Sequence, residues 1–394
     1  MSTCVATAMA SGTSHEASQA LSLALKKQLG DASPSLVMAF ASTRQPLGEV
    51  TAALARDFPH AVVLGASTAG EFTEVKDVKS AVSAFALAGD FKVFAGMSEG
   101  LKADPAAAVS RALSALPTAV TDFPHKTGLL LLDPLAGNGE ECTLLVAAHV
   151  GGDEILAGGA AGDDLQMKRT LVSLGARAAS DALVFARIFS RTPLGLGVSH
   201  GHKPLSVPLR VTKASGGVVY EIEGRPAWDV WKEHTKESAA RRGVSVDEIA
   251  PADEISYLLR YEAGIATGAE FKIRAPLSRA ADGSISFACG IPEGTVIRIT
   301  ESEPEAQVAS ARDAARKAKG MLGGKRVAGA LVFDCICRNL ILGDDFVRAV
   351  RGMAEELGTV PVAGFETYGE IALASGDMSG FHNTTSVVLA FPVE

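Results

Sequence analysis

The chain has 394 residues, enough for two domains of ordinary size. Its 47% hydrophobic and 21% charged residues are typical of a soluble globular protein. A net charge of −8 argues against nucleic acid or an anionic membrane as the main partner. No apolar run approaches the roughly 20 residues that cross a bilayer. Scattered cysteines and the lack of a signal-peptide pattern predict a cytoplasmic protein without a disulfide framework.

The first half of the chain alternates helices and strands after a predicted flexible tail, residues 1–15. Helices are predicted over 16–29, 46–57, 104–116 and 140–150. Strands are predicted over 35–41, 61–67, 81–88, 91–96, 128–133, 154–156, 171–176, 182–189 and 195–199. Two successive units of helix, strand, helix, strand and antiparallel strands therefore fill roughly 16–205.

The second half starts with a predicted hairpin, a helix and a polar connector over 241–253. Further strands are predicted over 271–273, 284–288, 295–301, 327–335, 360–363 and 385–391, with helices over 304–321 and 344–357. The strand-helix-strand unit thus occurs once more. We predict an α/β fold of repeated strand-helix-strand units, forming mixed sheets with packed helices. Two domains are expected, over 16–223 and 224–394.

Three similar glycine motifs follow predicted strands: 65–71 (motif 1), 157–163 (motif 2) and 364–370 (motif 3). Their glycines are expected to supply positive φ or close backbone approach. Ser67, Thr68, Glu366 and Thr367 then lie at the carboxyl ends of strands, where open α/β sheets bind ligands. The alternative is a tight turn whose hydroxyls satisfy local backbone groups. Motif 3 is favoured as a site because it also carries Tyr368 and Glu370.

Several residues near motif 3 extend this candidate site. Arg338 follows a predicted buried strand and suits a ligand carboxylate or phosphate, although a solvated loop arginine is the alternative. Cys335 and Cys337 share one face if the strand continues, and inert buried cysteine is the simpler interpretation for at least one. His382 and Asn383 precede the last strand; Asn383 also suits a cap or turn.

No reaction-specific constellation is found, so the chain is not predicted to be an enzyme. Motif 1 has Ala69 where a nucleophile elbow needs glycine. A hydrolase using Ser67 or Cys335 is kept as an alternative, and so is a pure interaction scaffold. His200 and His202 are a further pair of imidazoles, but spacing alone places no third metal ligand beside them.

Residues 63–71, 197–205 and 220–228 resemble the FIST N-terminal domain, and 333–338, 364–370 and 381–385 resemble the FIST C-terminal domain. The resemblance covers residues 33–392. It implies a sensory module that binds a small ligand and signals through a partner such as a histidine kinase or receptor. Nothing is fused to the matched region, so the output is expected to go to a separate protein. A homodimer is a further candidate assembly.

The chain also resembles the haem-binding, nitric-oxide-sensing (NosP) members of the family. That similarity implies haem b as the cofactor, and an axial ligand is commonly histidine. His382, His200 and His202 are the candidates, in that order. The alternative is a sensor of amino acids or small acids without haem. The expected ligand-binding residues are Arg338, Glu366, Thr367, Tyr368, Glu370, Cys335, Asn383, Ser67 and Thr68.

Overall fold

The computed structural model describes residues 2–75, 77–78, 80–268, 270–374 and 380–394. Within these residues the chain builds one αβ unit three times. The first unit comprises β1 (Cys4–Ala10), α1 (Ser14–Leu29), β2 (Pro34–Ala41), α2 (Leu47–Asp57), β3 (Val62–Ser67), β4 (Glu71–Thr73), β5 (Asp77–Val78) and β6 (Val82–Ala88). The second comprises β7 (Phe91–Glu99), α3 (Pro105–Leu113), β8 (His125–Leu132), η1 (Pro134–Ala136), α4 (Gly139–Val150), β9 (Ile155–Ala160), β10 (Val172–Leu174), β11 (Arg177–Ala179) and β12 (Ala182–Ser190).

The third unit is interrupted by an inserted subdomain, residues 202–302. The unit itself comprises β13 (Gly195–His200), α7 (Pro304–Gly320), β23 (Val327–Cys335), α8 (Ile336–Leu342), η2 (Gly343–Asp345), α9 (Phe346–Leu357), β24 (Val362–Thr367), β25 (Glu370–Leu373), β26 (Gly380–His382) and β27 (Thr385–Pro392). The inserted subdomain comprises β14 (His202–Pro204), β15 (Leu209–Ser215), β16 (Val218–Ile222), β17 (Arg225–Pro226), α5 (Ala227–Ala240), α6 (Glu254–Arg260), β18 (Tyr261–Thr267), β19 (Glu270–Arg274), β20 (Pro276–Arg279), β21 (Ile285–Phe287) and β22 (Val296–Ser302).

Within the predicted flexible tail, residues 4–10 form β1 and α1 begins at Ser14, so the prediction of a tail is wrong for these residues. β1 pairs antiparallel with β6 from Cys4↔Ala88 to Ala10↔Val82. Its mostly small side chains are compatible with a loop in sequence, but here residues 5–8 are buried, Ala6 and Ala8 in a cluster with residues of α1 and Val5 in the central core. Thr13 then begins α1 with a capping box, accepting from the Glu16 amide while the Glu16 carboxylate accepts from the Thr13 amide.

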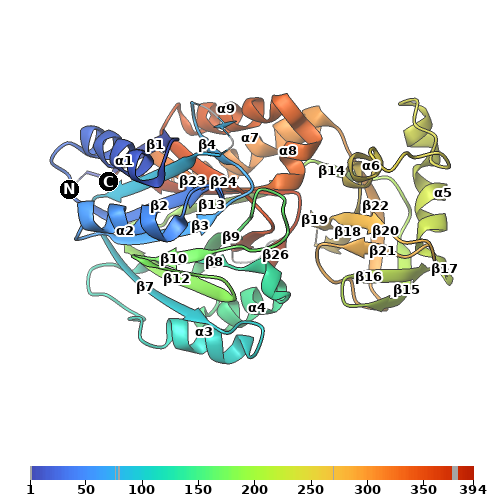
Figure 1. The fold of residues 1–394 in the computed structure, drawn as a ribbon, viewed down its shortest axis with the longest axis horizontal. Coiled ribbons are helices and arrows are strands. Elements are labelled where there is room, and N and C mark those ends of the chain that lie inside the picture. The colour runs from blue at the N-terminus through green and yellow to red at the C-terminus, as the bar shows by residue number, and fades with distance from the viewer. Residues whose placement is uncertain (1, 76, 79, 269, 375–379) are drawn as a thin grey trace.

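The described strands form three six-stranded sheets and one nine-stranded sheet. Each six-stranded sheet has a parallel pair at its centre, namely β2–β3, β8–β9 and β23–β24, with antiparallel strands on both sides. The three units together form the body of the molecule, and the inserted subdomain projects to one side of it (Figure 1). The helices lie on the outside of the body in three groups: α1 and α2, α3 and α4, and α7 to α9. The predicted α/β fold with mixed sheets is confirmed.

The three units exchange hairpins in a cycle. The β4–β5 hairpin of the first unit pairs with β24 of the third. The β10–β11 hairpin of the second unit pairs with β3 of the first, and the β25–β26 hairpin of the third pairs with β9 of the second. No unit therefore completes its own sheet, which makes the body cooperative across both predicted domains.

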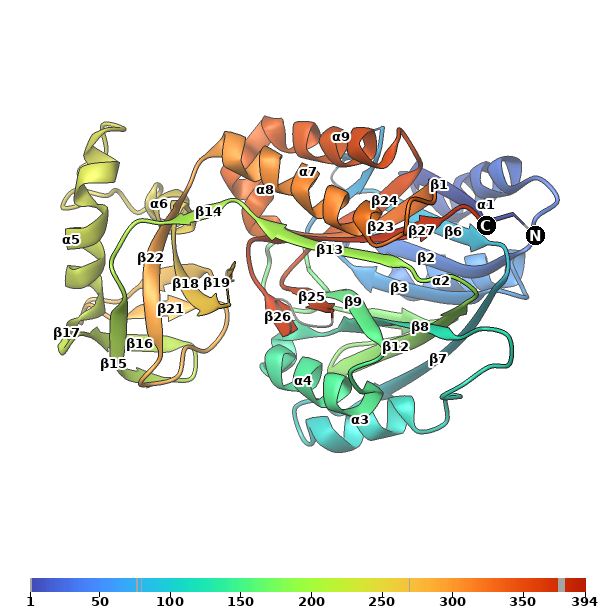
Figure 2. The same ribbon diagram turned by 180° about the vertical axis from the view of Figure 1, so that it is seen from behind.

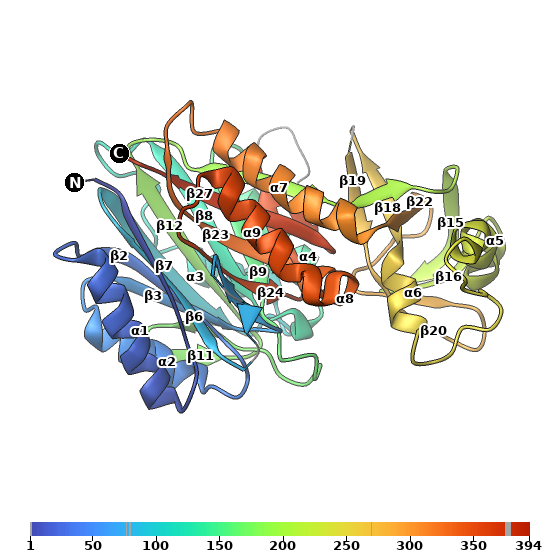
Figure 3. The same ribbon diagram turned by 90° about the horizontal axis from the view of Figure 1, so that it is seen from above.

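The same arrangement determines which strands share the core and which sheet β13 joins. Phe40 of β2 stacks on Phe365 of β24 with ring centroids 4.6 Å apart, inside a core shared by all three six-stranded sheets. β13, which the sequence division places in the first domain, pairs with β27 in the third sheet. Figure 2 shows β13 and β14 running from the body to the inserted subdomain, and Figure 3 shows α7 and α9 side by side over the third sheet.

Candidate functional site

The three glycine motifs meet at the centre of the body. The amide of Ala69 donates to the carbonyl of Glu366 (3.1 Å), and the amide of Glu366 donates to Gly70 (2.8 Å). In the same way, the amide of Tyr368 donates to the carbonyl of Ala160 (3.1 Å), and the amide of Ala160 donates to the carbonyl of Gly369 (2.8 Å). Gly162 and Asp164 donate to the carbonyls of Ser67 and Thr68 at 2.8 and 2.9 Å. Each motif is thus bound to both of the others.

Most of the motif glycines serve close approach and not positive φ. Of the seven glycines in the three motifs, all described residues, Gly158 has a positive φ, of 159°, and Gly65, Gly70, Gly159, Gly162, Gly364 and Gly369 do not. A Cβ on Gly70 would lie 2.5 Å from the carboxylate carbon of Glu366, and one on Gly162 would lie 2.6 Å from the amide nitrogen of Ala69. Any larger residue would force the motifs apart.

A threonine and a carboxylate close the turn within motif 1 and within motif 3. Thr68 donates to Glu71 and Thr367 donates to Glu370, in equivalent positions of the first and third units. The other oxygen of each carboxylate accepts a backbone amide, from Ala81 and from Thr385, both at 3.1 Å. Burial raises the pKa of Glu370 well above its ordinary value. These residues are fully buried, so they hold the architecture instead of facing a ligand.

Arg338, the predicted ligand anchor, is also fully buried. Its Nε donates to Asp334 at 2.7 Å, and its Nη atoms donate to Gln307 and to Ser310, the latter at 2.8 Å. Glu366 accepts from Asn339 at 2.6 Å. β23 ends at Cys335, and α8 begins at the next residue. The groups that accept hydrogen bonds from this guanidinium belong to β23 and α7. The structure does not retain the anchor role, because protein acceptors occupy the donors.

The candidate nucleophiles are not activated. The Ser67 hydroxyl accepts from the Leu171 amide at 2.8 Å and donates to the Leu171 carbonyl at 3.4 Å. Burial raises the pKa of the Cys335 thiol well above its ordinary value, which disfavours the reactive thiolate. Cys337 lies in α8 and does not share a strand face with Cys335. An activated nucleophile has an adjacent base or a lowered pKa, and neither the bonds of Ser67 nor the raised pKa of Cys335 supports the hydrolase alternative.

His200 ends β13, and His202 begins the inserted subdomain beside the acidic group of Glu262. The ring centroids of His200 and His202 are 6.3 Å apart, and His202 Nε2 is 3.6 Å from Glu262 Oε2. Burial raises the pKa of Glu262 and lowers that of His202 well below its ordinary value. Burial also lowers the pKa of His200 to about 4. Asn383 follows His382 directly, and its side-chain amide donates to the His382 carbonyl at 3.0 Å.

His382 is fully buried in β26, opposite Glu370. Burial, together with the nearby cations of Lys272 and Arg274, lowers its pKa to about 3. A haem needs an open imidazole face and an apolar slot beside it. None of the three histidines lines any of the hollows described below, and so the residues present do not fit a haem.

A cleft does open beside motif 3, between α4 and the inserted subdomain; we call it the α4 cleft. Its outer part has a volume of about 1000 Å³, and an inner part of about 350 Å³ reaches Tyr368 and Phe381. The two parts share Glu140, Glu141, Gly216 and Gly290. Clefts of this size between domains are common sites for small ligands.

The α4 cleft has a cationic base and apolar walls. Arg274 is 2% exposed; it donates to Glu140 and, at 3.1 Å, to the carbonyl of Phe381. Lys272 donates to the same Glu140 at 2.9 Å. The Nε of Arg274 is buried without an acceptor among the described residues. The apolar lining comes from Leu144, Leu145, Ile265, Ile291 and Pro292.

Tyr368 connects this cleft to motif 2. It is half-buried, lines the inner part of the cleft, and donates to Asp163 Oδ1 at 2.7 Å. Burial and this bond raise the pKa of Tyr368. Of the predicted ligand-binding residues, Tyr368 therefore lines the α4 cleft, and Ser67 lines a separate hollow beside α2.

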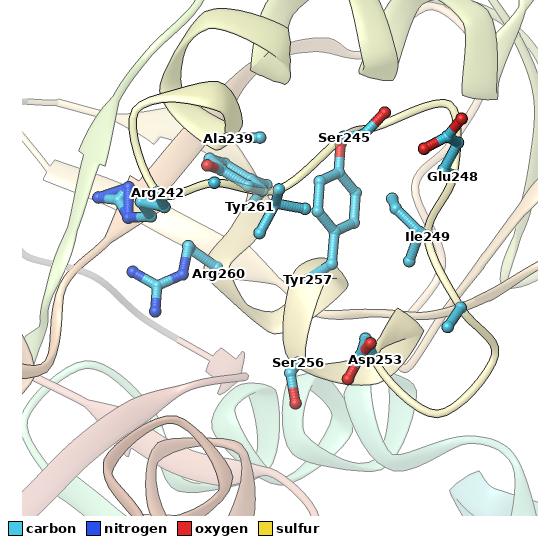
Figure 4. Close-up of a pocket in the computed structure, with 13 residues that line it drawn as sticks. Ala239, Arg242, Ser245, Glu248, Ile249, Asp253, Ser256, Tyr257, Arg260 and Tyr261 are labelled. Atoms are coloured by element: carbon cyan, nitrogen blue, oxygen red, sulfur yellow. The ribbon is translucent and has the colours of Figure 1, made fainter.

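Another cavity, of about 380 Å³, lies within the inserted subdomain (Figure 4). Tyr257 and Tyr261 stand in it with ring centroids 5.1 Å apart. Its cations, Arg242 and Arg260, both pair with Glu303, the residue before α7. They therefore join the inserted subdomain to the third unit, and neither is an unpaired cation.

Sequence reasoning missed Arg274, Lys272 and Glu140. One signal was available: Lys272 and Arg274 are two apart in a short strand and so share a face. Their partner Glu140 lies more than 130 residues earlier, and only the folded chain brings these groups together.

These observations define a class: a three-unit αβ body with an inserted subdomain and a ligand-sized cleft between them. The FIST N domain model matches residues 35–225 and the FIST C domain model matches residues 227–373. The chain therefore belongs to the FIST family. Domains of this family are generally sensory, ligand-binding domains of signalling proteins.

Similar curated proteins are uncharacterized. One from Methanocaldococcus jannaschii is 24% identical over 249 residues, which cover 59% of this chain and 47% of that protein. One from Mycobacterium bovis is 27% identical over 198 residues, 49% of each. The chain spans about half the length of the curated relatives it matches. In the part of the chain that the structure describes, every helix is too short or too polar to cross a membrane.

Proposed function

We propose that the protein is a sensor that binds a small organic acid, amino acids included, in the α4 cleft. In this proposal the signal goes to a partner protein such as a histidine kinase or receptor. The supporting observation is Arg274: a guanidinium at the base of an apolar cleft, with an Nε atom that lacks an acceptor among the described residues. An arginine of this kind suits a carboxylate, and the aliphatic walls suit the rest of a small molecule.

The same residues suggest how binding is read out. Glu140 of α4 holds both Lys272 and Arg274, and so ties the inserted subdomain to the second unit. A ligand carboxylate at Arg274 competes with Glu140 for these cations. Binding then changes the position of the inserted subdomain against α4, and the partner senses that change.

A thermal-shift screen of amino acids and small carboxylic acids tests the proposal. A ligand at a hundred times its Kd adds about 2.7 kcal/mol to stability. Arg274→Met is expected to lower its affinity about 10- to 100-fold, since a charged hydrogen bond contributes roughly 1.5–3 kcal/mol. Arg225→Met, at an exposed ion pair of the same subdomain, is the matched control and should leave affinity unchanged. A hit that binds the Arg274 variant equally well contradicts this site, and a screen without any hit contradicts the sensor of small acids.

A haem-based nitric oxide sensor is predicted by the family resemblance alone. Since the candidate histidines do not fit a haem, we expect titration with haemin to give no Soret band that shifts with nitric oxide. The measurement is an absorption spectrum of the purified protein with and without nitric oxide. A saturating, nitric-oxide-sensitive band that is lost in His382→Ala would reverse this expectation and identify the ligand.

A further inference from the structure

A second hollow, of about 200 Å³, occupies in the first unit the place that the α4 cleft occupies in the second; we call it the α2 hollow. Both lie before the second helix of their unit and are lined by residues in or after the glycine motif of the next unit, which for the α4 cleft are Tyr368 and Phe381. In the first unit these residues belong to 163–171, which we call the covering segment. The corresponding place in the third unit holds α8, where Ile336 and Cys337 pack against Ala69.

The α2 hollow is electropositive. Lys168 and Arg169 line it, and neither side chain has a hydrogen-bond or ion-pair partner among the described residues. Pro46 precedes α2 and supplies no side-chain cap, so the positive end of the helix is open toward the same space. The acidic group in the lining, Asp163, already accepts from Tyr368 and from backbone amides of the covering segment, including that of Arg169 at 2.9 Å.

The covering segment is held in a fixed, strained shape. Asp164, Leu165 and Met167 all have positive φ, between 52° and 61°. The carboxylate of Asp164 accepts from Ser42 and from the amide of Thr43, at 3.0 and 2.9 Å. Strain of this kind persists where surrounding bonds impose it, and it clusters at binding sites.

Gln45 adds an acceptor that needs a donor. Gln45 is 5% exposed and lines the hollow; its Nε2 donates to the Gly12 carbonyl at 2.8 Å. Its Oε1 is buried without a donor among the described residues. A buried amide oxygen without a partner costs free energy that a ligand O–H or N–H recovers on binding.

We propose that the α2 hollow is a second ligand site, which binds a phosphate group. Lys168, Arg169 and the start of α2 take the anionic oxygens, and Gln45 Oε1 accepts from a hydroxyl of the ligand. Hydrogen phosphate carries both kinds of group at neutral pH, whereas sulfate and simple carboxylates offer no donor. With a volume of about 200 Å³, the hollow has room for phosphate with a few attached carbon atoms. This proposal does not depend on a ligand in the α4 cleft.

Calorimetric titration of the full chain with sodium phosphate and with sodium sulfate at equal ionic strength tests the proposal. Phosphate is expected to bind at least about tenfold more tightly than sulfate. Glycerol phosphate forms a second arm: tighter binding than free phosphate identifies a small phosphate ester as the preferred source, and weaker binding identifies the free ion. Phosphate without saturable heat, or sulfate that binds equally well, overturns the proposal.

Variants assign the binding to this hollow. Lys168→Ala with Arg169→Ala changes two exposed side chains, so the fold is retained, and we expect at least a tenfold loss of phosphate affinity. Gln45→Met is expected to reduce the phosphate-to-sulfate ratio, a readout that partial destabilisation does not imitate. Arg274→Met should leave phosphate binding unchanged, which separates this site from the α4 cleft. Phosphate binding that survives the loss of both cations contradicts the assignment.

Discussion

Arg338→Met is expected to lower the free energy of unfolding by about 3–5 kcal/mol, because it leaves the carboxylate of Asp334 buried without its cation. Both side chains are fully buried, and burial already raises the pKa of Asp334 while Arg338 opposes that effect. Gln307 and Ser310 lose a donor in the same substitution. Chemical denaturation, monitored by circular dichroism, measures the change.

The matched control is Arg348→Met, which removes an arginine whose partner Glu305 is 74% exposed. Exposed pairs contribute about 0–1 kcal/mol, so this variant should unfold almost as the parent does. Adding Asp334→Asn to Arg338→Met is expected to restore part of the lost stability, since no buried charge then remains unpaired. A loss below about 1 kcal/mol for Arg338→Met, together with weaker ligand binding, would instead return Arg338 to the role of ligand anchor.

Acid should destabilise the protein through its buried histidines, His382 among them. The pKa of His382 is about 3 in the folded chain, against an ordinary value near 6.5. The folded state therefore binds fewer protons than the unfolded state between these two values, and stability is lost as the pH falls through that range. At about 1.4 kcal/mol per pKa unit, the loss is roughly 2 kcal/mol by pH 5 and roughly 5 kcal/mol by pH 3.

Buried carboxylates act in the opposite direction, so the histidine term is measured as a difference. The raised pKa values of Glu262 and Glu370 mean that the folded state holds their protons more tightly, and acidification favours folding through these groups. His382→Phe replaces the titratable imidazole with a ring that does not titrate. The stability advantage of the parent over this variant should shrink as the pH falls from 6.5. His60→Phe, at an exposed position, serves as the control; a parent-minus-variant difference that is constant with pH would contradict the prediction for His382.

The repeated unit was readable in the sequence because its signals are local. Strands with small-residue turns, and helices with their own apolar stripes, repeat in the same order, and motifs 1 and 3 share glycines, a threonine and a carboxylate. β1 was missed because short, mostly small side chains give no strong strand signal. It becomes a strand because β6 offers an edge and α1 covers its face.

The candidate site was less predictable than the fold. Residues near motif 3 are close in sequence and chemically suited to a ligand. In the structure, however, Arg338, Glu366, Thr367 and Glu370 already have hydrogen-bond partners within the protein core. A sequence shows which groups are polar, but it does not show which of them already have partners. Because the polar groups of motif 3 already have partners, the proposed site lies in the cleft beside motif 3 and not at motif 3 itself.

By itself, the sequence determined the αβ units, their order and the membership in the FIST family, since these depend on local periodicity and on ordered motifs. Only the tertiary structure decided that the units exchange hairpins, that the motif glycines allow three turns to touch, and that Arg274 lies against Glu140. The physical reason is distance along the chain: pairings between units depend on which buried groups find partners, and that is settled only when all three units fold together.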